Sequence, residues 1–192
     1  TALEMFNQTC GATRFTVVDV HSAFFCMPVR KEDQFKLACS THRGMMTYKR
    51  MPQGFANSPS WLASGFAKML MTPYTGRGPA HVVGRPCLHS ICTQFVDDIA
   101  IYSDDEYHLD YVEFIFKLLE KHNLSLRADK CQIGRRSLEY LGVNLSADGL
   151  RVSTDKVKAL HEAPSPRDVE GVKRLMGQLN FHRAWIKEFA HN

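Results

Sequence analysis

Residues 88–102 decide the fold, and they read Leu-His-Ser-Ile-Cys-Thr-Gln-Phe-Val-Asp-Asp-Ile-Ala-Ile-Tyr. Two apolar runs flank the adjacent carboxylates Asp97 and Asp98, a pattern that predicts a strand, an acidic turn and a second strand. Aspartate is common in turns, so one interpretation is a solvated β-turn. The other is a functional pair, because two crowded or buried carboxylates are costly unless a cation compensates them.

A third carboxylate lies in a second apolar run. Residues 15–20 read Phe-Thr-Val-Val-Asp-Val, and alternation along a strand places Asp19 on the same face as Val17. An acid among apolar neighbours needs a partner, and a divalent ion shared with Asp97 and Asp98 would supply one. Ligation by oxygen atoms alone favours Mg²⁺ or Mn²⁺ over zinc.

The segments between and after these runs mix strand and helix signals. Residues 35–50 predict a hairpin around Arg43-Gly44, and Asn57-Ser58-Pro59 predicts a helix start. Residues 72–86 hold three prolines and three glycines and predict a loop that is long enough to indicate an insertion. Ser103-Asp-Asp-Glu106 has the form of a capping box that opens a helix.

The last third of the chain changes character. Residues 137–143 predict a further strand, and Asp148-Gly149 predicts a turn. From residue 151 the pattern becomes helical, and Ser165-Pro166 begins a segment with one apolar face. Because strands and helices are mixed first and helices stand alone afterwards, we expect an α+β domain over residues 1–150 and a small helical subdomain over 151–192.

The bulk composition bounds the class of protein. The chain has 192 residues, 44% of them hydrophobic, and a net charge of +4, which suits a phosphate-binding surface without requiring one. No stretch approaches the roughly 18 apolar residues of a membrane span. The chain starts at Thr1 without a signal peptide or an initiator Met, so we expect a piece of a longer protein or a processed product.

The cysteines indicate neither a disulfide framework nor a zinc site. Six cysteines without a secretion signal are typical of reduced intracellular thiols. His81, Cys87, His89 and Cys92 gather in one segment, but their spacing fits no common zinc pattern. We interpret them as ordinary core and loop residues.

Six blocks of the sequence, taken in order, resemble the reverse transcriptases of retroviruses and of gypsy-type LTR retrotransposons. The blocks are Phe15–Val29, Met51–Pro59, Gln94–Asp98, Leu126–Cys131, Tyr140–Gly142 and Gly177–Phe189. The resemblance implies a polymerase palm, an antiparallel sheet packed on helices with a ferredoxin-like core. Residues 1–150 would form this palm with a remnant of the fingers, and residues 151–192 would begin the thumb.

The resemblance also implies a reaction and its metal site. The chain would be a fragment of a Pol polyprotein, an RNA-directed DNA polymerase that adds dNTPs to a primer 3′-hydroxyl. Asp19, Asp97 and Asp98, together with Val20, would hold two Mg²⁺ ions (Mn²⁺ is the alternative) about 3.5–4 Å apart. Lys130 matches a lysine proposed to protonate the leaving pyrophosphate.

Other positions match residues that contact substrate in this family. Phe24 matches the aromatic that excludes a 2′-hydroxyl, although it is equally a core aromatic by residue type. Val20, Gln53 and Gly54 match positions near the incoming nucleotide, and Tyr140-Leu141-Gly142 matches the primer grip. In the thumb-like helical segment, Arg174 and Arg183 would either meet duplex phosphates or remain solvated helix charges.

The implied partners are an RNA or DNA template with its primer, dNTPs, and the RNase H and integrase regions of the parent polyprotein. The implied location is intracellular, in cytoplasmic virus-like particles with a nuclear phase, and not in a membrane. The chain departs from the family in three ways. Fingers strands before Phe15 are missing, His21-Ser22 replaces a pair that often includes an acid, and residues 72–90 are longer than usual.

Two other functions remain open. One is a catalytically silent module, similar to reverse transcriptase, that binds nucleic acid or protein. The three intact acids argue against it, and the missing fingers strands argue for it. The other is a generic Mg²⁺-dependent α+β enzyme of phosphoryl transfer, which leaves the order of Pro52-Gln53-Gly54 and Tyr140-Leu141-Gly142 unexplained.

Overall fold

A computed structural model describes residues 8–9, 11–104, 106–163, 165–181, 183 and 189. The elements run in the order β1 (Arg14–Asp19), α2 (Ala23–Cys26), the 3₁₀ helix η1 (Lys31–Leu37), β2 (Ala38–Thr41), β3 (Gly44–Thr47), α3 (Ser58–Leu70), β4 (Cys92–Phe95), β5 (Asp98–Ser103), α4 (His108–Lys121), β6 (Gln132–Arg135), β7 (Ser137–Tyr140), β8 (Val143–Ser146), β9 (Gly149–Val152), α5 (Thr154–Glu162) and α6 (Val169–Phe181). The expected α+β class with an antiparallel sheet is confirmed.

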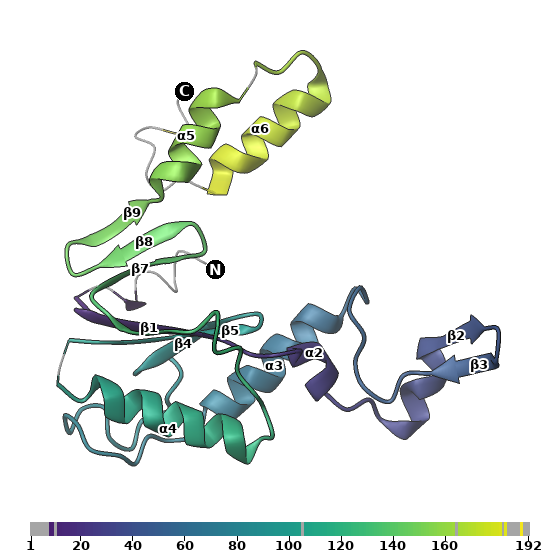
Figure 1. The fold of residues 1–192 in the computed structure, drawn as a ribbon, viewed down its shortest axis with the longest axis horizontal. Coiled ribbons are helices and arrows are strands. Elements are labelled where there is room, and N and C mark those ends of the chain that lie inside the picture. The colour runs from purple at the N-terminus through teal and green to yellow at the C-terminus, as the bar shows by residue number, and fades with distance from the viewer. Residues whose placement is uncertain are drawn as a thin grey trace.

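The central sheet has the strand order β4-β5-β1-β6, with all neighbours antiparallel (Figure 1). β1 is an inner strand, and four of its six residues are buried. β4 and β5 form a hairpin in which Phe95 pairs with Asp98. The strand, acidic turn and strand expected around Asp97 are therefore present.

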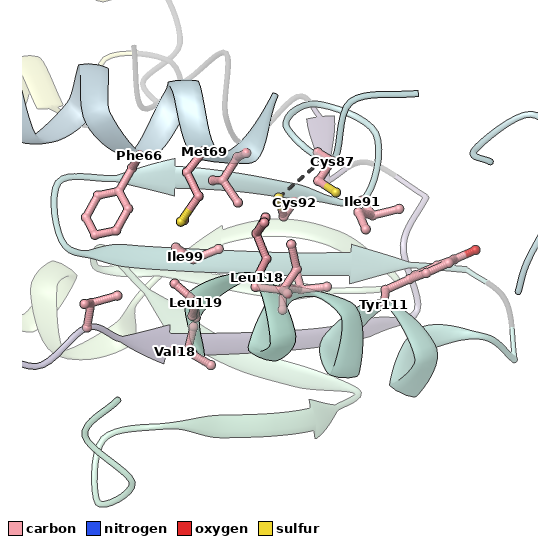
Figure 2. Packing of buried hydrophobic residues seen from close by; sticks show 14 of the residues in the cluster. Val18, Phe66, Met69, Cys87, Ile91, Cys92, Ile99, Tyr111, Leu118 and Leu119 are labelled. Atoms are coloured by element: carbon pink, nitrogen blue, oxygen red, sulfur yellow. Dashed lines mark hydrogen bonds between the residues drawn. The ribbon is translucent and has the colours of Figure 1, made fainter. Parts of the chain in front are cut away.

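Helices α3 and α4 cover one face of this sheet, and the larger core lies between them (Figures 1 and 2). We call it the helix-side core. Among its most deeply buried members are Val18, Leu62, Phe66, Leu70, Ile99, Ile101, Ile115 and Leu119. Because burying one such side chain stabilises the fold by about 1.5–3 kcal/mol, this core holds the helices on the sheet.

The opposite face carries a smaller core against the sheet β7-β8-β9. We call it the hairpin-side core, and its members include Phe15, Val17, Ala100, Tyr102, Leu138, Tyr140, Val143 and Leu145. Side chains alternate between the two faces of a strand. Asp19, two residues after Val17, and Asp98, two residues before Ala100, therefore lie on this second face.

The hairpin expected within residues 35–50 is present as β2 and β3, joined through a turn in which Gly44 has φ +98°. With η1 it forms an arm that extends away from the central sheet (Figure 1). Apolar side chains on the arm are open to solvent, including Phe35 at 68% and Met45 at 71% exposure.

The long loop after α3, residues 72–86, is closed by backbone hydrogen bonds and packs against α4. Its base is closed by Tyr74 N–H donating to the Arg85 carbonyl at 2.8 Å and Gly84 N–H donating to the Tyr74 carbonyl at 2.7 Å. The Tyr74 ring packs edge-on against Tyr111 and Phe114 of α4, with centroid distances of 5.1 and 5.0 Å. Cys92 Sγ donates to the Cys87 carbonyl at 3.3 Å, and both cysteines are fully buried (Figure 2).

One local prediction is wrong and others lie outside the described residues. Ser103 does not cap a helix, since it ends β5 and α4 begins five residues later at His108. Asp105 and most of residues 182–192, the end of the expected thumb block, are outside the described part of the chain. The division at residue 150 stays a prediction. Among the described residues, no helix is both long and apolar enough to cross a membrane.

His108 joins three elements through a buried polar network. Its Nε2 lies 2.8 Å from Thr16 Oγ1, and its Nδ1 lies 3.0 Å from Ser103 Oγ. We expect His108→Ala to lower the free energy of unfolding by about 2–4 kcal/mol, because it removes a buried side chain and takes a hydrogen-bond partner from two buried hydroxyls. Urea denaturation measures this. The control is His122→Ala in the exposed turn after α4, and equal losses in the two variants would contradict the structural role of His108.

Candidate active site

The strand pairing sets two carboxylates side by side. Asp19, the last residue of β1, is the direct partner of Asp98, the first residue of β5. Directly opposed residues on antiparallel strands have Cβ atoms about 4.5–5.5 Å apart, and like charges in this position are destabilising. The pair is therefore unfavourable by itself, and a bound cation would relieve the repulsion between the two carboxylates.

Asp97 lies in the two-residue turn before Asp98, and this turn is strained. Val96, its first residue, has φ +56°, a conformation that a β-branched residue rarely adopts. Such a residue costs about 1–3 kcal/mol and persists only where surrounding contacts impose it. Here Val20 N–H donates to the Asp97 carbonyl at 3.0 Å. The contact holds Asp97 beside the end of β1.

The Asp98 carboxyl reflects this crowding. Burial raises its pKa from 3.8 to about 6, with further contributions from the negative charges of Asp97 and Asp19. The positive charge of Lys130 acts in the opposite direction. Asp19, Asp97, Asp98 and Lys130 therefore share one electrostatic environment, although they come from three separate segments.

The segment after α4 brings basic groups to this site. His21 N–H donates to the Ser125 carbonyl at 2.8 Å, and Arg127 N–H donates to the Asp19 carbonyl at 3.0 Å. Lys130 Nζ lies 3.5 Å from Asp19 Oδ2, and Arg127 Nε lies 3.9 Å from Asp19 Oδ1. The sequence indicated Lys130 but not Arg127. The signal for Arg127 was its position three residues earlier in the same block.

The donor set suits a hard divalent cation, but the side chains do not form a ready cage. Carboxylate oxygens are the ligands that Mg²⁺ and Mn²⁺ prefer. Among the described residues, no three His, Cys, Asp or Glu side chains are arranged to hold an ion as they stand. The opposed carboxylates of Asp19 and Asp98, of which Asp98 has a raised pKa, fit such an ion by charge, provided that the side chains rotate toward it.

Phe24 and the Gln53–Gly54 turn lie between Asp19 and Asp97 along the chain. Phe24, in α2, is partly buried against the helix-side core. Gln53 and Gly54 are exposed, and Gly54 has φ +87°, which favours glycine. Ser58 Oγ donates to the Pro52 carbonyl at 3.0 Å and anchors this turn to α3. In the described part of the chain, no hydrogen bond or ion pair joins Gln53 to the acids.

The Tyr140-Leu141-Gly142 turn joins β7 to β8 on the face where Asp19 and Asp98 lie. Leu141 and Gly142 have φ values of +53° and +77°, as a tight two-residue hairpin turn requires. Tyr140 is 4% exposed, and its hydroxyl has no hydrogen-bond partner among the described residues. Burial and the charges of Asp98 and Asp97 raise its pKa, so this turn lies close to the acids.

An antiparallel sheet backed by two helices, with acids at the end of one strand and in an adjoining hairpin turn, defines a polymerase-type palm. The chain belongs to the reverse transcriptase family, because the family model described as reverse transcriptase (RNA-dependent DNA polymerase) matches residues 3–145. This confirms the resemblance seen in the sequence.

Relatives of the chain are polyproteins of mobile elements. It is 28% identical over 181 residues to the "Retrovirus-related Pol polyprotein from transposon opus" of Drosophila melanogaster, covering 94% of this chain and 17% of that protein. It is 27% identical over 177 residues to the "Transposon Tf2-3 polyprotein" of Schizosaccharomyces pombe, covering 92% and 12%. The chain thus spans about a sixth or less of the length of these relatives.

Solved structures share the fold. The foamy viral protease–reverse transcriptase in complex with double-stranded DNA has a TM-score of 0.82 at 21% identity, covering 100% of this chain and 31% of that one. The foamy viral protein in complex with an RNA/DNA hybrid has a TM-score of 0.76 at 21% identity, covering 95% and 23%.

The raised pKa of Asp98 predicts a pH effect on stability. Because the folded state favours the protonated acid, the stability that Asp98 provides is complete below pH 3.8 and is lost as the pH rises through about 6. With a chelator present to remove metal ions, Asp98→Asn should therefore raise the free energy of unfolding at pH 8 by about 1–2 kcal/mol. This value is lower than the full pKa shift would give, because solvent screens the partly exposed carboxyl.

The same variant should gain nothing at pH 4, where the acid is largely protonated in the folded state. Chemical denaturation across this pH range measures the difference. Asp148→Asn, in the exposed β8–β9 turn, is the control. A pH-independent gain for Asp98→Asn would contradict the charge effect, because such a gain does not follow the ionisation of the carboxyl.

Proposed function

We propose that this chain is the catalytic palm segment of an RNA-directed DNA polymerase that adds dNTPs to a primer 3′-hydroxyl. The observation that carries the proposal is the direct pairing of Asp19 with Asp98, next to Asp97 in the β4–β5 turn. Membership of the reverse transcriptase family supports it. The chain is a small part of its relatives, so the activity, substrates and partners of the whole protein are part of this proposal.

Reverse transcriptases generally use divalent metal ions. We assign two Mg²⁺ ions, or Mn²⁺, to the carboxylates of Asp19, Asp97 and Asp98. Val20 would add its backbone carbonyl as a ligand, because its side chain has no oxygen. When bound, such ions increase the acidity of the attacking hydroxyl and neutralise charge on the phosphates. The contribution of the protein is to hold the three acids, through the β1–β5 register and the Val20–Asp97 hydrogen bond, before substrate arrives.

Other side chains act on the substrates. Lys130, beside Asp19, is able to give a proton to the leaving pyrophosphate. Phe24 lies under the incoming sugar and excludes a 2′-hydroxyl, while Gln53 and Gly54 face the nucleotide. The turn at 140–142 holds the primer end close to the acids, a role that the charge effect of Asp98 on Tyr140 supports.

The proposed partners are a primed RNA or DNA template, dNTPs, and the RNase H and integrase regions of the parent polyprotein. The foamy viral proteins with this fold were solved with double-stranded DNA and with an RNA/DNA hybrid, which supports a duplex as the bound nucleic acid. Similarity to retrotransposon polyproteins supports an intracellular location, in cytoplasmic virus-like particles with a nuclear phase.

Primer extension on an RNA template, with dNTPs and Mg²⁺ or Mn²⁺, tests the proposal. Asp97→Asn should reduce extension at least about 100-fold, because it removes a carboxylate proposed to hold the ions that neutralise charge on the phosphates. The wild type and the Asp97→Asn variant are each assayed in two lengths, as this chain and as a longer piece of the parent polyprotein. Circular dichroism confirms that the variant folds.

The outcomes separate the possible functions. Extension that depends on Asp97 supports the polymerase, and extension in the longer piece alone makes this chain an incomplete part of it. Extension without a template would favour a generic phosphoryl-transfer enzyme. Silence in both lengths, with nucleic acid still bound, would replace the polymerase with a binding module.

Phe24 predicts the choice of sugar. Phe24→Val should raise the incorporation of rNTPs relative to dNTPs at least about tenfold, because the smaller side chain leaves room for the 2′-hydroxyl. The control is Phe25→Val, one residue along α2, where the side chain is 46% exposed. Single-nucleotide incorporation gives kcat/KM for each substrate. An unchanged ratio in Phe24→Val would make Phe24 a core aromatic only.

A further inference from the structure

Both oxygens of the Asp19 carboxylate lie near a cation that the chain itself provides. Arg127 Nε is 3.9 Å from Oδ1, and Lys130 Nζ is 3.5 Å from Oδ2. The Asp19 side chain is only 17% exposed, whereas those of Arg127 and Lys130 are 41% and 49% exposed. The carboxylate is therefore the most buried member of this group, and the two cations reach it from the solvent side.

The backbone holds Arg127 at this place independently of its charge. Arg127 N–H donates to the Asp19 carbonyl at 3.0 Å, and Val20, the residue after Asp19, forms an antiparallel β-bridge with Leu126, the residue before Arg127. Lys130 N–H then donates to the Arg127 carbonyl at 3.0 Å. A substitution of the Arg127 side chain consequently leaves the attachment of this segment to β1 intact.

Arg127 also has a second carboxylate within reach. Its Nη2 is 3.8 Å from Asp129 Oδ2, and the Asp129 side chain is 73% exposed. A guanidinium carries several donors and stays charged, so it exchanges between acids by a small side-chain rotation. Asp129 thus offers Arg127 a position outside the crowded pair of Asp19 and Asp98.

Given the metal site proposed above, we infer that Arg127 is a positioning residue that competes with a divalent ion for Asp19 and transfers to Asp129 when the ion binds. The guanidinium and the ion both need the oxygens of the same carboxylate. The ion pair is long and half-exposed, and such pairs are weak. Arg127 therefore tunes the metal affinity of the site and does not block it.

Removing the competitor tests the inference on the intact chain. Arg127→Gln should tighten Mn²⁺ binding about two- to fivefold, and Asp129→Asn should weaken it by a similar factor. In the Arg127→Gln background, Asp129→Asn should have little effect, because Asp129 acts through Arg127. Arg127→Lys, which keeps the positive charge, should have an affinity for Mn²⁺ within about twofold of the wild-type affinity. The electron paramagnetic resonance signal of free Mn²⁺ at low ionic strength gives each affinity.

Asp19→Asn separates failure of the inference from failure of the proposed function. If Asp19→Asn leaves Mn²⁺ binding unchanged, the proposed metal site is wrong and the competition falls with it. If it removes binding while Arg127→Gln leaves the affinity unchanged or lowers it, the site stands and Arg127 is not a competitor. Equal effects of Asp129→Asn with and without Arg127 would make Asp129 a direct electrostatic influence and overturn the exchange.

Discussion

The register between β1 and β5 is the constraint on which the site depends. It sets Asp19 opposite Asp98 and brings the turn with Asp97 to the same end of the sheet. A slip of one residue would turn every side chain of the strand to the other face. The two cores prevent this slip, because residues such as Val18 and Ile99 belong to one face and Val17 to the other. Packing on both sides of the sheet therefore holds two mutually repelling charges together.

Several features of the site destabilise the folded protein. Opposed carboxylates, a Val96 backbone with positive φ and the raised pKa of Asp98 are each unfavourable in the folded protein. They persist because the helix-side core, with its buried side chains from α3 and α4, stabilises the folded state by more than these features destabilise it. Arg127 and Lys130 offset part of the charge at Asp19. Strain and uncompensated charge gathered at one strand end are typical of a functional centre.

Periodicity and residue type were enough to predict the strands around Asp19 and Asp97, the helix beginning near Ser58 and the α+β class, because each depends on local pattern. They failed where the outcome depends on a distant partner. Ser103 has the spacing of a helix cap, but in the structure it ends β5 and pairs with Arg14 of β1, far away in the sequence. Arg127 looks like an ordinary surface charge until the β-bridge between Val20 and Leu126 brings it to Asp19. Neither contact is encoded in a short window of sequence.

The two faces of the central sheet consequently have different roles. Substitutions in the helix-side core act on the whole domain, since that core anchors α3 and α4 and contains none of the three acids. The hairpin-side core is smaller, and its sheet residues Val17 and Ala100 are two positions from Asp19 and Asp98 on the same face. Tyr140 packs in this core, and its pKa responds to the charges of Asp98 and Asp97. Since packed interiors transmit small shifts, a change of volume in the hairpin-side core acts on the face where the carboxylates lie, whereas the same change between the sheet and the helices acts on the opposite face.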